Sequence, residues 1–298
     1  MSENTGMKEP GKAVPGHYLV LLAAVLWGTT GTAGAFAPPS ATPEAIGAAR
    51  ITIGGLALLA ITLTRGTLRG HRWPLFATAT GCAGVAAYQA LFFSGVSRTG
   101  VAVGTIVAIG SSPVFGGLMG FFVHGERLSY RWALATALAV AGCVLLIGSG
   151  SEISVAPSGV LLSLGAGASY AAYATASKGL LKRIPPEAVM AVLFTGGAVL
   201  LSPVLALTGA GWLATTRGLG VALHLGIVAT AAAYFLFGRG LRLVPVATAT
   251  TLSLAEPLTA GLLGVFVLGE RLTPPALLGS ALVFCGLAVL SWRRPGVT

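Results

Sequence analysis

Long apolar stretches, separated by short gaps that carry proline, glycine or charge, run through nearly the whole chain. A helix that crosses about 30 Å of hydrocarbon needs about 20 apolar residues. Stretches of that length predict ten membrane-spanning helices, at residues 18–37, 44–64, 74–97, 99–124, 132–148, 157–181, 187–207, 219–241, 245–268 and 275–292. We therefore expect an all-α integral membrane protein.

The scarcity of charge agrees with a surface that faces lipid. Only 9% of the 298 residues are charged, whereas a soluble domain carries about 25%. The net charge of +10 does not indicate nucleic-acid binding, because the basic residues sit in the gaps rather than on one face of a folded domain. Cys82, Cys143 and Cys285 lie in apolar stretches without metal-ligand spacing. The lipid bilayer is the expected partner, and we predict no nucleic acid, metal or cofactor.

The basic residues also predict an orientation, because Lys and Arg are enriched in cytoplasmic loops. With ten helices and a cytoplasmic N-terminus, 14 Lys and Arg fall on the inner side, whereas only Arg98, Arg217 and Arg271 fall on the outer side. This distribution predicts that both termini are cytoplasmic, with tails at residues 1–17 and 293–298.

One nine-residue stretch occurs twice. Gly120–Leu128 reads GFFVHGERL, and Gly264–Leu272, 144 positions later, reads GVFVLGERL. Five predicted helices lie between the two copies, so the copies should face opposite sides of the membrane.

The similarity extends beyond that stretch. Residue pairs at the same separation are Phe93 and Phe237, Arg98 and Arg242, Pro113 and Pro257, and Gly142 and Gly286; at a separation of 143, Trp27 matches Tyr170. This pattern predicts two inverted five-helix repeats, residues 18–148 and 157–292, around a central cavity. Inverted repeats are typical of secondary transporters.

The chain resembles the ten-helix exporters of the drug/metabolite transporter superfamily, which are made of two EamA-type halves. The resemblance covers almost the whole chain and rests on Trp27-Gly28, Arg50, Ser112-Pro113, Glu256-Pro257 and the two Gly-Glu-Arg-Leu motifs. It implies export of amino acids, other metabolites or drugs across the bacterial inner membrane. Within the family, the chain is similar to aromatic amino-acid exporters.

Pro113 and Pro257 fall near the middle of two predicted helices. Proline lacks an N–H and clashes with the carbonyl four residues earlier. We therefore expect both residues to kink their helices beside the cavity and to free the carbonyls of Ile109 and Ser253 at membrane depth. A gating role and simple helix packing are the two interpretations.

Charges inside the predicted helices are the strongest candidates for chemistry, since each costs at least about 2.5–3.5 kcal/mol without a partner or a wet cavity. Glu256 is predicted to bind the substrate or a proton, with a structural role as the alternative. Arg50 could pair with Glu256, although packing or snorkelling towards the interface is favoured for it. His224 is the second candidate proton site, with a neutral, hydrogen-bonded histidine as the alternative.

Aromatic and polar side chains far from the predicted interfaces complete the predicted substrate site. Trp and Tyr usually favour the interface, and their N–H or O–H groups need partners when buried. A cavity with aromatic walls and a few polar groups suits amphipathic small molecules. Together with Glu256, the predicted substrate-binding residues are Trp27, Thr30, Tyr88, Gln89, Phe92, Ser112, Tyr170, Tyr173 and Tyr234.

These features predict a secondary transporter rather than an enzyme. We expect it to export small amphipathic metabolites by alternating access, with aromatic amino acids preferred over others such as threonine or methionine. The alternative is a multidrug exporter of lipophilic compounds, although the related pumps carry a Glu in the first helix, where this chain reads Trp27-Gly28-Thr29-Thr30. A monomer in the bacterial inner membrane is compatible with the sequence, which leaves the oligomeric state and the energy source open.

Overall fold

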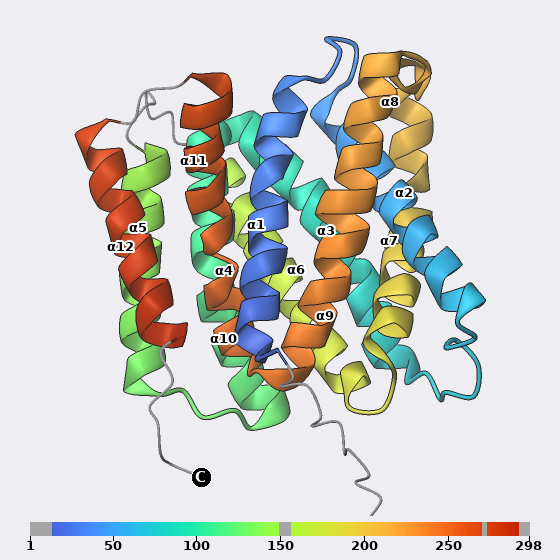
Figure 1. Cartoon of the computed structure of the whole chain (residues 1–298), viewed down its shortest axis with the longest axis horizontal. Coiled ribbons are helices and arrows are strands. Elements are labelled where there is room, and N and C mark those ends of the chain that lie inside the picture. Colours follow the sequence, from blue (N-terminus) through green and yellow to red (C-terminus); the bar gives the residue numbers. More distant parts are fainter. Residues whose placement is uncertain (1–13, 149–155, 270–272, 292–298) are drawn as a thin grey trace, which may run out of the picture.

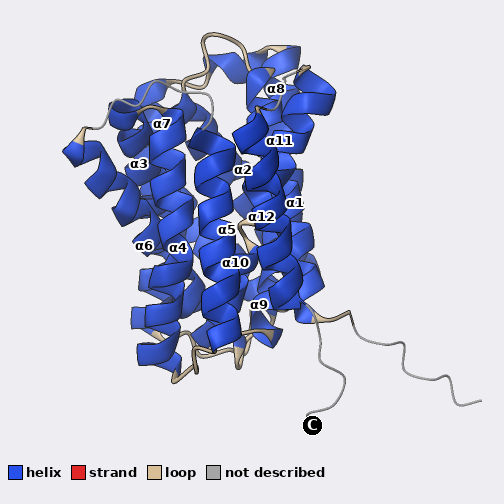
Figure 2. Cartoon of the chain, turned by 90° about the vertical axis from the view of Figure 1, so that its left-hand side faces the viewer, coloured by secondary structure: helices blue, strands red, loops and turns tan. Residues whose placement is uncertain are grey.

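The computed structural model describes residues 14–148, 156–269 and 273–291, and in them the chain is almost entirely helical (Figures 1 and 2). The first half contains α1 (Gly16–Ala35), α2 (Pro43–Thr64), α3 (Leu75–Thr99), α4 (Val101–His124) and α5 (Tyr130–Gly148). The second half contains α6 (Pro157–Leu181), α7 (Pro186–Thr208), the 3-10 turn η1 (Gly211–Ala214), α8 (Thr216–Leu223), the π-helical η2 (His224–Ala232), α9 (Ala233–Leu243), α10 (Val246–Leu252), α11 (Ala255–Leu268) and α12 (Pro274–Ser291).

These elements form the ten predicted spans, with two of the spans built from more than one element. The eighth span joins α8, η2 and α9, and the ninth joins α10 and α11. Among the described residues, eight helical spans are long and apolar enough to cross a membrane, and α5 contributes a shorter apolar helix. The 25-residue α6 is not one of these eight spans, and it packs beside α3 and α4. The chain is therefore a multi-pass membrane protein.

Helix contacts follow the predicted two-fold relation between the halves. The first helix of each half packs mainly on the other half: α1 lies against α9 and α11, and α6 lies against α3 and α4. Equivalent helices also meet each other, as α2 meets α7 and α5 meets α12. In the α5–α12 contact, a Cβ on Gly142 would lie 2.6 Å from the Gly279 carbonyl, and one on Gly286 would lie 2.7 Å from the Ala135 carbonyl. The two matched glycines therefore have the same role: each allows close approach of the α5 and α12 backbones.

The repeated Gly-Glu-Arg motif marks the end of a helix in each half. Gly125 has φ +66° and ends α4, and the N–H of Glu126 bonds to the Gly120 carbonyl at 3.1 Å. Gly269 has φ +73° and ends α11 in the same left-handed conformation. Glycine adopts this conformation without the steric cost that a Cβ brings. Glu270 and Arg271 of the second copy lie outside the described residues.

The acid of the first copy reaches the other half. Oε1 of Glu126 accepts a hydrogen bond from the Val246 N–H at 2.8 Å, and Oε2 accepts one from the Ala247 N–H at 3.4 Å, so this side chain caps α10. Lys178 of α6 donates from Nζ to the last carbonyls before α10, those of Leu241, Arg242 and Val244, at 2.8, 3.2 and 2.7 Å. The turn between α9 and α10 is therefore fixed from both sides. It lies on the face where α1 begins and α12 ends, at the bottom of Figure 1 and called the terminal face below.

Contrary to the prediction from the sequence, Pro113 and Pro257 do not leave the carbonyls four residues earlier without hydrogen bonds. The helix α4 continues through Pro113, and the Ile109 carbonyl accepts a hydrogen bond from Oγ of Ser112 at 2.9 Å. The ninth span does break, between Leu252 and Ala255, but the Ser253 carbonyl accepts the Glu256 N–H at 3.0 Å. The prediction that both carbonyls are free was wrong. A serine hydroxyl in one case and a tighter turn in the other replace the bond that proline removes.

Candidate functional site

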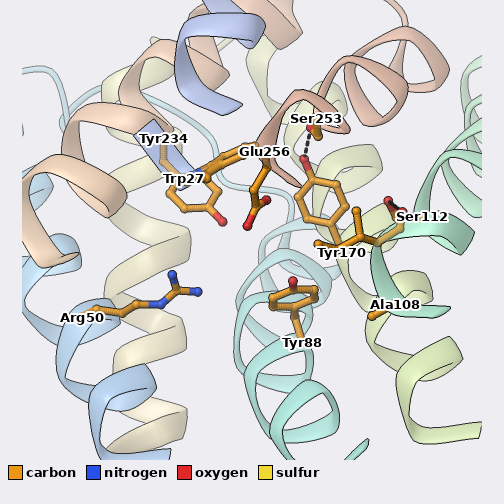
Figure 3. Close-up of a pocket in the computed structure, with 10 residues that line it drawn as sticks. Trp27, Arg50, Tyr88, Ala108, Ser112, Tyr170, Tyr234, Ser253 and Glu256 are labelled. Carbon is orange, nitrogen blue, oxygen red and sulfur yellow. Dashed lines mark hydrogen bonds between the residues drawn. The ribbon is translucent and has the colours of Figure 1, made fainter. Parts of the chain in front are cut away.

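A cavity lies between the two halves, at the level where the ninth span breaks (Figure 3). Both halves supply its walls. Its lining residues are Trp27 of α1, Arg50 of α2, Tyr88 of α3, Ala108, Ile109 and Ser112 of α4, Tyr170 of α6, Tyr234 of α9, Ser253, and Glu256 of α11. The predicted central cavity is thus present, and six of the ten predicted substrate-binding residues line it.

Aromatic rings in mutual contact form much of this lining. The rings of Trp27 and Tyr234 lie 4.8 Å apart, and Trp27 meets Tyr170 edge to face at 6.4 Å. Tyr88 lies 6.1 Å from Tyr170. The hydroxyl of Tyr170 is fixed by a 2.8 Å hydrogen bond to the hydroxyl of Ser253, drawn as the dashed line in Figure 3. Aromatic pairs in such geometries add to the packing energy of the cavity wall.

The eighth span widens into a π-helix just before Tyr234. Within η2, Oγ1 of Thr230 donates to the Leu225 carbonyl, five residues earlier, at 2.8 Å. Such turns are rare and are frequently found at functional sites. Here Tyr234, two residues beyond η2, points into the cavity.

Arg50 enters the cavity from α2 and is held by Gln89 of α3. With the Gln89 amide turned so that its oxygen faces the guanidinium, that oxygen accepts hydrogen bonds from Nη2 and Nε at 3.0 and 3.1 Å. Gln89 is itself only 3% exposed. The sequence had favoured packing or snorkelling for Arg50, and the structure instead turns its charged group toward the cavity (Figure 3).

Glu256 points into the same space from the second half of the chain (Figure 3). Its carboxylate forms no hydrogen bond to another described residue, and the part of the chain that the structure describes contains no ion pair between Glu256 and Arg50 within 4.0 Å. A carboxylate at this depth needs a proton, water or a cationic partner. The break in the ninth span places it there, because Glu256 sits in the first turn of α11.

Trp27 contributes a second unpaired group. It is 4% exposed, and its Nε1 has no hydrogen-bond acceptor among the described residues. The residue that matches it in the other half, Tyr170, bonds to Ser253, and the position equivalent to Ser253, 144 residues earlier, is Ile109. The side chain of Ile109 has no acceptor, so the Tyr170–Ser253 bond has no side-chain counterpart between the equivalent residues of the first half.

The other predicted site residues lie around this cavity rather than in its lining. Gln89 and Tyr173 line a smaller neighbouring cavity, which shares Tyr88, Tyr170 and Tyr234 with the first. The Tyr173 hydroxyl contacts Sδ of Met190 at 3.0 Å. Phe92 stacks on Tyr88 with ring centroids 5.7 Å apart. Thr30, Pro113 and Pro257 line neither cavity.

His224 also lies outside both linings. Its Nε2 is 2.9 Å from Oγ1 of Thr29, which itself donates to the Leu26 carbonyl at 2.7 Å. This contact links α1 to η2. A proton site at His224 stays a prediction.

Sequence reasoning missed Arg50, Ser253, Ala108 and Ile109 as cavity residues. Ser253 and Ile109 had been considered only for their backbone carbonyls. The sequence did contain a signal for these two residues. Ser253 precedes Glu256 by three residues, and Ile109 precedes Ser112, the position equivalent to Glu256, by three residues. Residues three apart share one face of a helix.

Two inverted five-helix repeats around a buried cavity that is both charged and aromatic define a membrane transporter. Residues 14–148 and 157–292 each match the model of the EamA-like transporter family. The chain belongs to this family.

Comparisons with single proteins agree with this assignment. The chain is 51% identical to the uncharacterized transporter YwfM of Bacillus subtilis, over 91% of this chain and 92% of that protein. It is 26% identical to a probable terminal-alkyne amino-acid exporter of Streptantibioticus cattleyicolor, over 83% of each chain. A solved crystal structure of 26% sequence identity superimposes with a TM-score of 0.81 and covers 93% of this chain and 96% of that one.

Proposed function

We propose that the protein exports amino acids across the bacterial inner membrane by alternating access, with aromatic amino acids preferred over others such as threonine or methionine. The observation that carries this proposal is the buried cavity between the repeats, where Arg50 and Glu256 point into one space among the rings of Trp27, Tyr88, Tyr170 and Tyr234. Such a space suits a small molecule with both charges and an apolar side chain.

The similarity to a relative named as a probable amino-acid exporter supports the substrate class and the direction of transport. The charge distribution along the sequence supports an orientation with the terminal face, and hence both termini, in the cytoplasm. In that orientation, the α9–α10 turn held by Glu126 and Lys178 lies on the cytoplasmic side.

Arg50 is the feature that disfavours the alternative, a multidrug exporter. A lipophilic cation in this cavity would meet a fixed guanidinium, and two like charges in a medium of low dielectric repel strongly. Glu256 alone would suit such a cation, whereas the pair suits a molecule that carries both signs.

The test is flux into liposomes that contain the purified protein. We would compare tryptophan, phenylalanine, threonine and a lipophilic cation, each with and without a pH gradient. Saturable amino-acid flux above that of empty liposomes is expected, and a response to the gradient would show proton coupling. Saturable flux of the cation alone would contradict the proposed function and favour a drug exporter.

A further inference from the structure

Arg50 reaches the cavity with part of its hydrogen-bonding capacity unused. A guanidinium carries five N–H donors in a flat fork. Gln89 accepts from Nε and from Nη2, which leaves the end of the fork formed by Nη1 and the second N–H of Nη2. No other described residue accepts a hydrogen bond from this end. Two parallel N–H groups are the arrangement that binds a carboxylate through both of its oxygens.

Trp27, which also lines the cavity, holds a further unpaired donor. Its Nε1 is buried and has no acceptor among the described residues, and a buried donor left unpaired is destabilising. An acceptor atom on a bound molecule would remove that cost. Trp27 and Arg50 both come from the first half of the chain and both line the cavity.

Glu256 provides the opposite charge from the second half. Its carboxylate is unpaired among the described residues, and Glu256 lines the cavity together with the aromatic rings (Figure 3). A positively charged group bound in this space is attracted by the carboxylate, and a ring whose face it meets adds to that attraction. The two ends of the cavity therefore differ in sign, with donors on the first half and an acceptor on the second.

We propose that this cavity holds its cargo as a zwitterion in one fixed orientation, with the cargo carboxylate bound by Arg50 and Nε1 of Trp27 and the cargo ammonium bound by Glu256. Gln89 is the positioning residue that turns the open end of the Arg50 fork toward the cargo. This assignment rests on the proposed function and specifies it, because it requires a free carboxylate and a free ammonium on the same molecule.

The experiment uses three competitors that share an indole ring and differ in which charged group of tryptophan they carry. Tryptophan carries both charges, tryptophan amide lacks the carboxylate, and indole-3-propionate lacks the ammonium. Each competes with labelled tryptophan for uptake into liposomes that are preloaded with unlabelled tryptophan. For the wild type, tryptophan should compete at least about tenfold better than either analogue, because a hydrogen bond to a charged group contributes about 1.5–3 kcal/mol.

Two variants should produce a crossed pattern. In Arg50→Gln, tryptophan and indole-3-propionate should each weaken about tenfold or more while tryptophan amide is unchanged. In Glu256→Gln, tryptophan and tryptophan amide should weaken while indole-3-propionate is unchanged. Ligand-induced stabilisation of the purified variants against heat gives the same comparison where uptake is too slow to measure.

The controls are variants of the same type outside the cavity. Arg239→Gln removes a guanidinium that lies over the Phe235 ring, 4.3 Å from its centroid, and Glu44→Gln changes an acid in the first turn of α2. Both should leave the order of the three competitors unchanged. Arg50→Lys, which keeps the charge and loses the fork, should weaken tryptophan less than Arg50→Gln does, and it replaces that variant if Arg50→Gln does not fold.

The outcomes separate this assignment from the proposed function. Equal weakening of all three competitors in both cavity variants would overturn the zwitterion assignment and indicate that Arg50 and Glu256 serve the fold or pair with each other in another conformation. If the wild type moves threonine but not tryptophan, threonine and threonine amide replace the indole compounds. Absence of saturable movement of any amino acid would remove the proposed function, and this assignment with it.

Discussion

The two halves of the molecule share a backbone plan and differ in the chemistry that they bring to the cavity. Glu256 of the second half lies 144 positions after Ser112, and Ser253 lies 144 positions after Ile109. All four side chains line the same cavity. Backbone symmetry gives a transporter two equivalent conformations, whereas the side chains that the two halves of this chain place in the cavity are not equivalent.

The two spans that contain the equivalent prolines also differ between the halves. The helix α4 passes through Pro113 unbroken, whereas the ninth span stops at Leu252 and restarts at Ala255. In each span a serine hydroxyl donates a hydrogen bond to a carbonyl of its own helix. Ser112 donates to the Ile109 carbonyl, and Ser253, at the break, donates to the Ala249 carbonyl at 3.0 Å. Only the broken span carries the acid, and the break puts Glu256 at the start of a helix.

The largest effect is expected when the acid is replaced by the residue of the other half. Glu256→Ser should lower the initial rate of amino-acid uptake by at least about tenfold, because the ammonium loses a charged partner worth about 1.5–3 kcal/mol. Uptake into liposomes measures this effect, with Glu44→Ser as the control outside the cavity. If the variant keeps most of its activity, the halves are equivalent at this position and Glu256 is not a cargo contact.

A smaller effect is expected at the repeated motif. Glu126→Ala removes the carboxylate that caps α10, and loss of such a cap typically costs about 0.5–2 kcal/mol. The purified variant should unfold at a lower temperature than the wild type, and Glu126→Gln, which keeps one acceptor oxygen, should lose less. Glu270→Ala provides the comparison between halves: an equal loss would mean that the second copy has the same role, and no loss from Glu126→Ala would contradict the capping role itself.

Adding a hydroxyl to the first half should make it more like the second. Ile109→Ser places an acceptor where Ser253 has one, so Nε1 of Trp27 gains a partner from the protein itself. We expect the apparent affinity for tryptophan to fall about two- to tenfold relative to Ile109→Ala, because one neutral hydrogen bond is worth about 0.5–1.5 kcal/mol. Half-saturation concentrations of uptake measure this. Equal affinities in the serine and alanine variants would mean that Trp27 donates no bond to the cargo.

The smallest effect is expected for the reciprocal change. Tyr170→Phe removes the bond to Ser253 and leaves the ring packing in place, which should cost about 1 kcal/mol of stability. Thermal unfolding of the purified protein measures this cost, and Tyr18→Phe, at a residue that is 51% exposed, serves as the control. A more stable variant would mean that the Tyr170–Ser253 bond holds no part of the cavity wall.

Much of the fold was predictable because its determinants are local or periodic. The lengths of the apolar stretches predicted ten spans, and the spacing of Gly142 from Gly286 and of Pro113 from Pro257 predicted two related halves. The glycine of each Gly-Glu-Arg motif ends its helix through a backbone conformation that glycine alone adopts easily. These determinants lie in short segments or in their spacing, and the bilayer adds the requirement that each apolar span be helical.

The site could be predicted only in part. Trp27, Tyr88, Ser112, Tyr170, Tyr234 and Glu256 were expected at the cavity from their depth in the spans, and all of them line it. Thr30, Phe92 and His224 lie at similar depth but do not, because depth along a helix does not say which way a side chain faces in the bundle.

The sequence by itself determined the membrane-spanning helices, the inverted repeat and the presence of deep charges, since each follows from composition and spacing along one chain. Only the tertiary structure decided that Gln89 accepts hydrogen bonds from Arg50 in the cavity wall, that Glu126 caps a helix 120 residues away, and that the N–H of Trp27 has no partner among the described residues. Each of these depends on which side chain stands opposite across two packed helices, and contacts between distant segments are fixed by the packing of the whole bundle.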